Sequence, residues 1–205
     1  KNPLPYLESA IVEARGGSYD SARDYIQQAI NLKPNFTEAF FLLSQLEIAQ
    51  GNVEAAIKST QSVISLEPQN PARYYQLGVL ESARKNLQGA IAAFEQAVAL
   101  DQNYANARYL RALAYDEAGR SGDAKTQLEA VLNLNPGNAD ITTLLQTINV
   151  DGSLSKLRTK PGQTVSEVAP VTNENGTVST TQESSTPLVT PVNTAPKTET
   201  ETVTQ

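Results

Sequence analysis

The chain of 205 residues contains no Cys, His, Met or Trp and has a formal net charge of −6. Without His and Cys it cannot form a Ser-His-Asp triad, a Cys nucleophile, a disulfide or an ordinary zinc or copper site. The acidic balance and the scattered basic residues argue against nucleic acid or an anionic membrane as a partner, and no apolar run predicts a membrane span.

The chain repeats itself with a period of 34 residues. The segments that fall in register are "LKPN" at 32–35, "LEPQ" at 66–69, "LDQN" at 100–103 and "LNPG" at 134–137. A column of small residues contains Ala22, Ala56, Ala90 and Ala124. A turn column contains Gly17, Gly51 and Gly119, with Lys85 in the remaining place. Several columns in one register indicate true repeats, which run over 3–36, 37–70, 71–104 and 105–138.

Each of the four units is predicted to be a helical hairpin. In unit 37–70, apolar residues follow helical spacing twice, first through Phe40 and Leu43 and then through Ala56 and Ile57. A turn with Gly and Asn, "QGNVEAA", separates the two runs. A proline, which stops a helix, closes three of the units: Pro34, Pro68 and Pro136.

The segment after the fourth unit, 139–149, is predicted to be a cap helix. Its apolar residues, Ile141, Leu144, Leu145 and Ile148, recur at helical spacing, and polar residues take the other face. Such a helix would cover the last hairpin and present a polar surface to solvent.

Residues 3–149 resemble the tetratricopeptide repeat (TPR) family. The family places an aromatic residue early in the first helix, a small residue four positions later, a Gly at the turn, a small residue early in the second helix and a late Pro. The matching aromatics are Tyr6, Phe40 and Tyr74, and the matching small residues are Ala10, Ser44, Gly78 and Ala112. The departures are Arg108 in place of an aromatic, Gln102 in place of the Pro, and Glu13, Glu47 and Glu81 where the family prefers Tyr. The resemblance implies an all-α fold, a right-handed solenoid of four hairpins with a cap helix, followed by a non-helical extended tail over 150–205.

The resemblance also implies a non-catalytic scaffold whose first helices line a concave groove for peptides. The predicted groove residues are Leu7, Ile11, Phe41, Gln45, Tyr75, Val79, Tyr109 and Leu113. Some members grip a terminal carboxylate with Lys and Asn, but the matching positions here lack those residues. Two alternatives stay open for the same side chains, namely packing between hairpins and self-association.

No cofactor or metal is expected. The column of Glu13, Glu47 and Glu81 cannot ligate one ion, because equivalent helices of neighbouring repeats lie on the order of 10 Å apart. Pairing with nearby Arg and Lys across repeats is the preferred interpretation. The stretch "GRSGDAK" at 119–125 lacks the Lys-Ser/Thr pair of a phosphate-binding loop and falls on a hairpin turn.

Residues 159–205 are rich in Thr, Ser, Pro, Glu and Val. This composition cannot offset a chain entropy of about 1–2 kcal/mol per residue, so the segment should be disordered unless a partner holds it. Thr186, Thr190 and Thr194 beside prolines are candidate O-glycan sites, and Asn35 and Asn175 lie in N-glycan sequons.

Two functions remain open from the sequence. The first is a bacterial, exported TPR scaffold that binds extended peptides, located outside the cell or on its surface, with the cytoplasm as the alternative location. The second is a self-assembling subunit of an extracellular, glycosylated filament whose copies join through the solenoid ends or the tail. The start "NPLPYLESA" followed by repeats also resembles the C-terminal TPR region of bacterial multi-spanning membrane proteins of the O-antigen ligase type.

Overall fold

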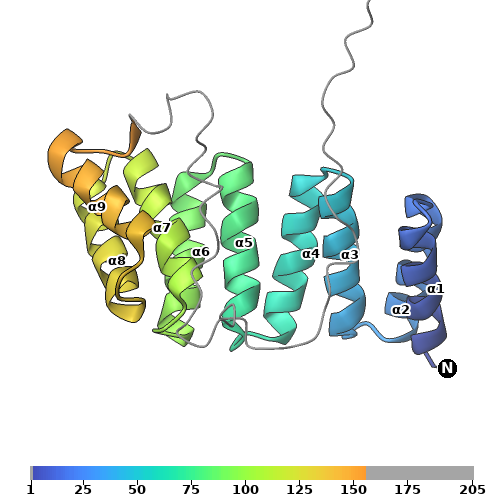
Figure 1. Ribbon diagram of the computed structural model, residues 1–205. Helices are drawn as coiled ribbons and strands as arrows, with labels where there is room; N and C mark the ends of the chain where they lie inside the picture. Colours follow the sequence, from blue (N-terminus) through green and yellow to red (C-terminus); the bar gives the residue numbers. More distant parts are fainter. Residues whose placement is uncertain (1, 156–205) are drawn as a thin grey trace, which may run out of the picture.

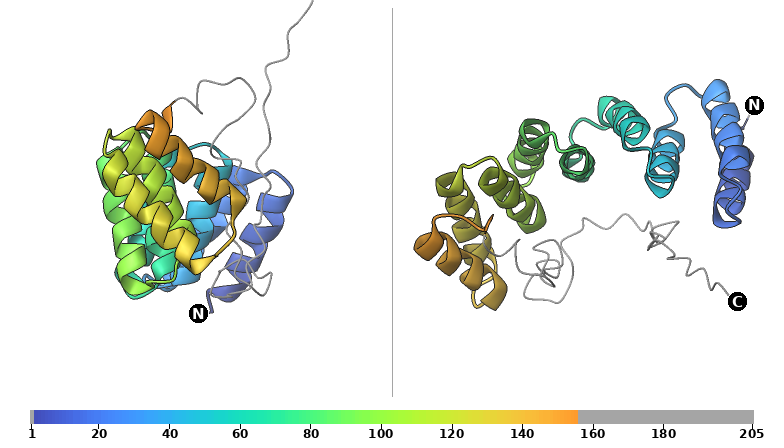
Figure 2. Two further views of the ribbon diagram at one scale, coloured as in Figure 1. Left: turned by 60° about the vertical axis from the view of Figure 1, so that its left-hand side comes forward. Right: turned by 90° about the horizontal axis from the view of Figure 1, so that it is seen from above.

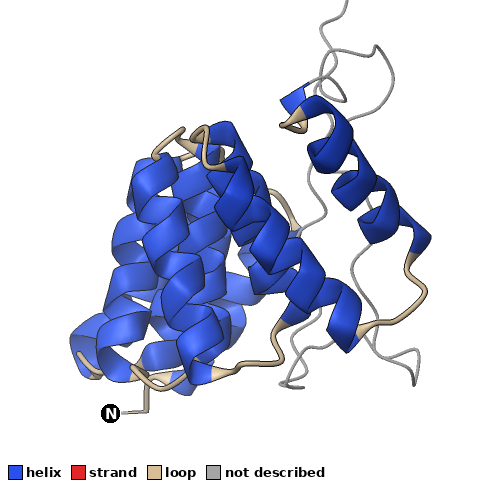
Figure 3. Ribbon diagram, turned by 90° about the vertical axis from the view of Figure 1, so that its left-hand side faces the viewer, coloured by secondary structure: helices blue, strands red, loops and turns tan. Residues whose placement is uncertain are grey.

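The computed structural model describes residues 2–155, in which nine helices and no strand occur (Figures 1 and 3). The helices are α1 Leu4–Arg15, α2 Tyr19–Leu32, α3 Thr37–Ala49, α4 Val53–Leu66, α5 Pro71–Ala83, α6 Leu87–Leu100, α7 Ala105–Glu117, α8 Ser121–Leu134 and α9 Ala139–Asp151. Consecutive helices pair into four hairpins, and each hairpin packs against the next in chain order. α9 packs against α8 at the end of the array. The prediction of an all-α solenoid of hairpins is confirmed. The cap helix extends to Asp151, two residues beyond the predicted 139–149, so the predicted non-helical tail does not begin at residue 150. Residues 156–205 of that predicted tail lie outside the described residues.

The turn inside each hairpin requires one residue with a left-handed backbone conformation. Gly51 and Gly119 have φ of 74° and 77°, which glycine adopts without steric cost because it has no Cβ. Lys85, in the same column of the repeat, has φ of 65° and is the one described non-glycine residue with positive φ. The third hairpin therefore makes the same turn as the others with a residue that disfavours it.

A pair of buried positions holds the two helices of each hairpin together. In the third hairpin the pair is Gly78 and Phe94, and a Cβ added to Gly78 would lie 2.5–2.8 Å from three atoms of the Phe94 ring. In the second hairpin the pair is Ser44 and Thr60, whose hydroxyls lie 2.8 Å apart in a hydrogen bond. The same positions by the repeat period are occupied by Ala10 with Ile26 and by Ala112 with Leu128, all buried. A small residue on the first helix is thus matched to a larger one on the second, so the hairpin interior stays filled.

Between the second and third hairpins the apolar core is reduced to a small cluster, in which Ala56 and Ile57 of α4 pack against Leu80 of α5. One cluster of buried side chains joins α1, α2 and α3, and the largest one joins α6, α7, α8 and α9. Between them, the buried Ser44 hydroxyl accepts a hydrogen bond of 3.0 Å from the Nε2 of Gln76, in addition to its bond with Thr60. Leu42 occupies the position of Gln76 in the previous repeat and is buried in the first cluster. This junction is therefore held partly by hydrogen bonds rather than by apolar contact alone.

The hairpins stack along a curved line, and the array forms an arc in the view from above (Figure 2). The first helices of neighbouring hairpins contact one another, as α1 does with α3 and α5 with α7, whereas the second helices make no comparable contact within the described residues. The array therefore curves toward its first helices, which form the inner, concave face.

Candidate peptide-binding face

Four rows of side chains run across the concave face, and we call them the inner stripe. On each first helix they stand at helical spacing of three and four residues, which places them on one face. The rows are Leu4, Glu38, Ala72 and Asn106; Leu7, Phe41, Tyr75 and Tyr109; Ile11, Gln45, Val79 and Leu113; and Ala14, Ile48, Ser82 and Asp116.

The eight predicted groove residues form the two central rows of this stripe. Val79 is 40% exposed, Tyr109 is only 7% exposed, and the other six are half-buried. Tyr109 belongs to the large core cluster, so packing is its main role. The sequence analysis missed Leu4 and Ile48, which are 51% and 40% exposed and flank the central rows. Their helical spacing from Leu7 and Gln45 indicates that they share the same helix face, although it does not indicate their exposure.

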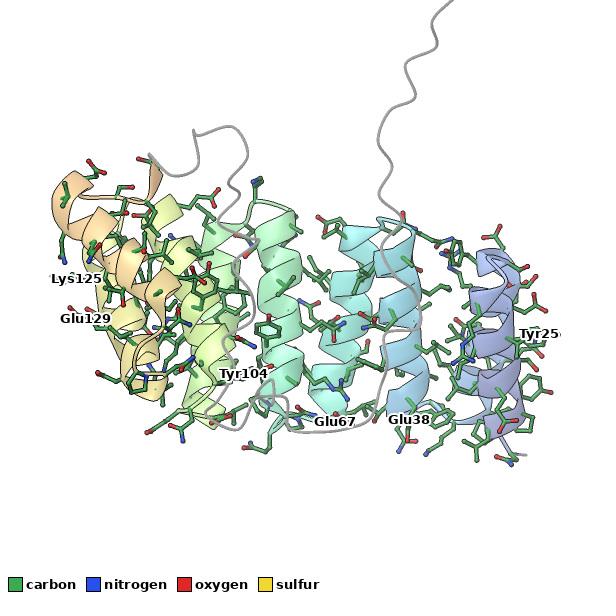
Figure 4. The ribbon with its side chains drawn as sticks, in the orientation of Figure 1. Tyr25, Glu38, Glu67, Tyr104, Lys125 and Glu129 are labelled. Atoms are coloured by element: carbon green, nitrogen blue, oxygen red, sulfur yellow. The ribbon has the colours of Figure 1, made fainter. Side chains whose placement is uncertain are left out.

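Aromatic packing fixes the middle of the stripe. The Tyr75 ring stacks on Tyr104 with centroids 5.2 Å apart and meets Phe94 at 6.0 Å. Burial raises the pKa of both phenols, and more strongly that of Tyr104, which lies at the start of α7 (Figure 4). The guanidinium of Arg73 lies 4.4 Å from the Phe41 ring centroid, a cation–π contact between α3 and α5. These rings are therefore held in defined positions, which lowers the entropy lost when a ligand contacts them.

The stripe has no Lys or Arg, and its two carboxylates stand in the outer rows. Glu38 lies on the lower edge of the array in Figure 4, in the first turn of α3. Asp116 is 5% exposed and accepts three hydrogen bonds: 2.8 Å from the Ser121 hydroxyl, 3.1 Å from the Ser153 hydroxyl and 3.0 Å from the backbone N–H of Leu154. The central rows are uncharged.

The glutamate column forms ion pairs in the second and third hairpins. The Glu47 carboxylate accepts hydrogen bonds of 3.2 Å from Arg23 Nε on α2 and 3.0 Å from Asn52 Nδ2. Glu81 accepts bonds of 2.6 Å and 3.0 Å from Arg84 and 2.8 Å from Asn86. The Arg23–Glu47 pair crosses between repeats as the sequence suggested, whereas Glu81 pairs within its own hairpin. Residues 2–155 contain no group of His, Cys, Asp and Glu that could hold a metal ion.

Among the described residues, the remaining sequence candidates lie outside the inner stripe. Asn35 is exposed in the loop after α2, and Asn175, Thr186, Thr190 and Thr194 lie outside the described residues. The "GRSGDAK" stretch consists of the end of the turn after α7 and the first residues of α8. Across the described part of the chain, no helix combines the length and the apolar character that crossing a membrane needs.

The fold and the inner stripe define a helical-repeat solenoid of the kind that serves as a protein–protein interaction scaffold. The sequence pattern of the tetratricopeptide repeat matches residues 14–78 and 82–148, more than half of the chain. The chain belongs to the tetratricopeptide repeat family. No curated protein matches it at a significant level.

Solved structures of TPR proteins share the fold. A crystal structure of MamA matches with a TM-score of 0.65 at 24% sequence identity, covering 75% of this chain and 85% of that one. A MamA structure from Desulfovibrio magneticus RS-1 matches with a TM-score of 0.59 at 20% identity, covering 67% and 78%. YrrB, described as a TPR protein with an unusual peptide-binding site, matches with a TM-score of 0.61 at 20% identity, covering 76% and 83%. At these identities the likeness establishes the fold alone.

Proposed function

We propose that this protein is a non-catalytic scaffold that binds extended, uncharged peptide segments of other proteins along its inner stripe. TPR proteins are generally scaffolds without catalytic activity, and YrrB, which has the same fold, is described as having a peptide-binding site. An extended peptide presents alternate side chains to such a face and leaves its backbone free for hydrogen bonds.

One observation carries the proposal: Leu4, Ile48 and Val79 are three of the six large apolar side chains that are exposed in residues 2–155, and all three lie on the inner stripe. Exposed apolar side chains that gather on one face mark an interaction site, whereas single scattered ones need no explanation. The central rows carry no charge, and the Arg73 guanidinium that lies over Phe41 is already paired with Glu67 at 3.0 Å, so a charged ligand side chain would lose its hydration there without an unpaired charge to meet. The ligand should therefore be apolar and uncharged where it crosses those rows.

A peptide-display selection with the full chain tests this proposal. Selected peptides should be apolar and uncharged, and Val79→Glu should weaken their binding, measured by calorimetry, at least tenfold. Val150→Glu is the matched control, since Val150 is 82% exposed on α9, away from the stripe, and should bind as the wild type does. Equal binding by Val79→Glu and the wild type, or a selection that yields no peptide, would overturn the proposal.

The filament alternative rests on a different surface, the outer face of α1. Val12 is 68% exposed there, while its counterparts in the next two repeats, Leu46 and Leu80, are 1% and 5% exposed. The same face also carries the exposed charge of Glu8, where Leu42 is buried in the next repeat, so it suits solvent better than a partner. The molecular mass measured by light scattering distinguishes the two functions. Large assemblies that disappear in Val12→Glu and persist in Val150→Glu would favour the filament over the peptide scaffold.

The exported, bacterial location and the glycan decoration belong to this proposal as well. Their support is the Thr- and Pro-rich composition of residues 159–205 and the sequons at Asn35 and Asn175. Intact-mass measurement of protein isolated from its native source tests the glycans, and fractionation of the cells tests the location.

A further inference from the structure

The last described residues of the chain are anchored to the inner stripe itself. After α9 the chain turns back at Gly152, with φ of 75°, and Leu154 becomes fully buried in the large core cluster. The Leu154 N–H and the Ser153 hydroxyl both donate to the same Asp116 oxygen, at 3.0 Å and 3.1 Å. Asp116 is the α7 member of the outer row that begins with Ala14, and it follows Leu113 by three residues. The described chain therefore ends, at Ser155, close to the edge of the stripe.

The chain beyond Ser155 contains one segment whose chemistry fits the stripe. Residues 184–196, "SSTPLVTPVNTAP", form the longest run after Ser155 without Lys, Arg, Asp or Glu. The segment offers Leu188, Val189 and Val192 as apolar contacts. Its three prolines favour an extended conformation before binding, which reduces the entropy lost on docking. The stripe has carboxylates in its outer rows and no basic residue, so it should disfavour the acidic neighbouring segment "TETET".

The linker is long enough for the segment to reach the stripe of its own chain. Residues 156–183 would span about 30 Å as a random chain. Helices pack on the order of 10 Å apart, so α5 and α3 lie within that reach of α7. A tethered ligand of this kind has an effective concentration on the order of 1 mM. A peptide with a dissociation constant of about 100 μM in free form would then occupy its own stripe most of the time.

We propose that Ser184–Pro196 docks on the inner stripe of its own chain, near Asp116 where Ser153 and Leu154 are bonded to α7, and competes with peptides from other proteins. This inference rests on the proposed function, because it requires the stripe to bind peptides. The protein would then be self-blocked until a ligand with higher affinity displaces the segment.

The first experiment measures how strongly a fluorescent peptide of residues 184–196 binds to three full-length proteins. In the variant Leu188→Asp with Val189→Asp, the chain's own segment is disabled, so the added peptide should bind about tenfold more tightly than to the wild type. The matched control, Thr177→Asp with Val178→Asp, adds the same charge outside the segment and should bind as the wild type does. Equal affinity for the wild type and the Leu188 variant would overturn docking within one chain.

The outcomes separate this inference from the proposed function. If display-selected peptides bind and the 184–196 peptide binds none of the proteins, the inference is wrong and the proposed function stands. If neither kind of peptide binds, both are wrong.

A second experiment distinguishes the chain's own segment from that of a second copy. Because the chain has no Cys, the variant Val79→Cys with Val189→Cys carries the only two thiols. Mild oxidation of a dilute sample should yield a disulfide within one chain, seen as a monomer that has lost both free thiols and migrates faster on a non-reducing gel than after reduction; a monomer that keeps both thiols would contradict the docking. Disulfide-linked dimers instead of monomers would overturn docking within one chain and point to a second copy.

Discussion

Replacing Gly78 by Ala adds a methyl group where the hairpin has no room for it. The new Cβ would lie 2.5 Å, 2.6 Å and 2.8 Å from three atoms of the Phe94 ring, closer than real Cβ contacts allow. Phe94 is fully buried and its ring also meets Tyr75, so it cannot move away without disturbing the middle of the inner stripe. The two helices of the third hairpin would have to separate instead.

The expected loss follows from two opposing terms. Overpacking of a well-filled core costs about 1–3 kcal/mol. Replacing a helix-interior Gly by Ala gains about 1 kcal/mol of helix propensity. The net change in the free energy of unfolding is therefore a loss of about 0–2 kcal/mol, whereas helix propensity alone would give a gain of about 1 kcal/mol. Adding Phe94→Leu should recover much of it, because the fourth hairpin already pairs Ala112 with Leu128 at these positions.

Urea unfolding followed by far-UV circular dichroism measures this effect in the two single variants, the double variant and the wild type. The double variant should be more stable than the sum of the single losses by about 1–3 kcal/mol, since the two residues share one space. Gly122→Ala is the control: Gly122 lies in α8, and an added Cβ there meets nothing within 4 Å. It should leave stability unchanged or raise it slightly. A Gly78→Ala protein about 1 kcal/mol more stable than the wild type, or strict additivity in the double variant, would refute the steric argument.

Three further predictions use the same unfolding assay. Lys85→Gly should raise the free energy of unfolding by about 1 kcal/mol, because glycine adopts the φ of 65° without the Cβ clash. Lys85→Ala keeps a Cβ and should give no gain. Equal unfolding midpoints for the wild type and both variants would contradict this. Burial raises the pKa of the Tyr104 phenol in the folded chain, so its contribution to stability is fully present below pH 10, the ordinary pKa of Tyr, and is lost as pH rises through the higher folded pKa. The wild type should therefore lose stability above about pH 10, and Tyr104→Phe should lose less. Parallel pH profiles of the two proteins would contradict the assignment. Ser44→Ala should cost about 1–3 kcal/mol, because it leaves the buried Thr60 hydroxyl and the Gln76 amide without their partner, and adding Thr60→Val and Gln76→Leu should restore most of the loss. A triple variant no more stable than Ser44→Ala would show that the junction does not depend on this hydrogen-bond network.

Much of the fold could be predicted because a repeat displays each structural requirement several times. The Gly at 51 and 119, 68 residues apart, showed that this column is a turn, and the structure gives both a left-handed φ. The same alignment placed Phe41 and Tyr75 in one row on successive first helices. Peptide binding by these side chains stays a prediction, because the repeat pattern reports packing requirements and not ligand contacts.

The sequence could not show how each side chain divides its surface between the core and solvent. Tyr75 and Tyr109 occupy equivalent positions in the repeat, yet Tyr109 is buried and Tyr75 is half-exposed. The difference depends on neighbouring hairpins and on residues far along the chain, which a period of 34 residues does not encode. For the same reason the spacing alone did not single out Leu4 and Ile48 as exposed.

By itself the sequence determined the elements of this protein: helical hairpins, their number in residues 3–138, their turns and the face that each first helix presents. These features depend on local spacing and backbone preference, which can be read from residues close together in the chain. Only the tertiary structure decided that Phe94 fills the space left by Gly78, that Gln76 joins the Ser44 network, and that Ser153 and Leu154 return to Asp116. Those contacts depend on how hairpins stack, because they join residues from separate helices whose distances are set only when the whole array has formed.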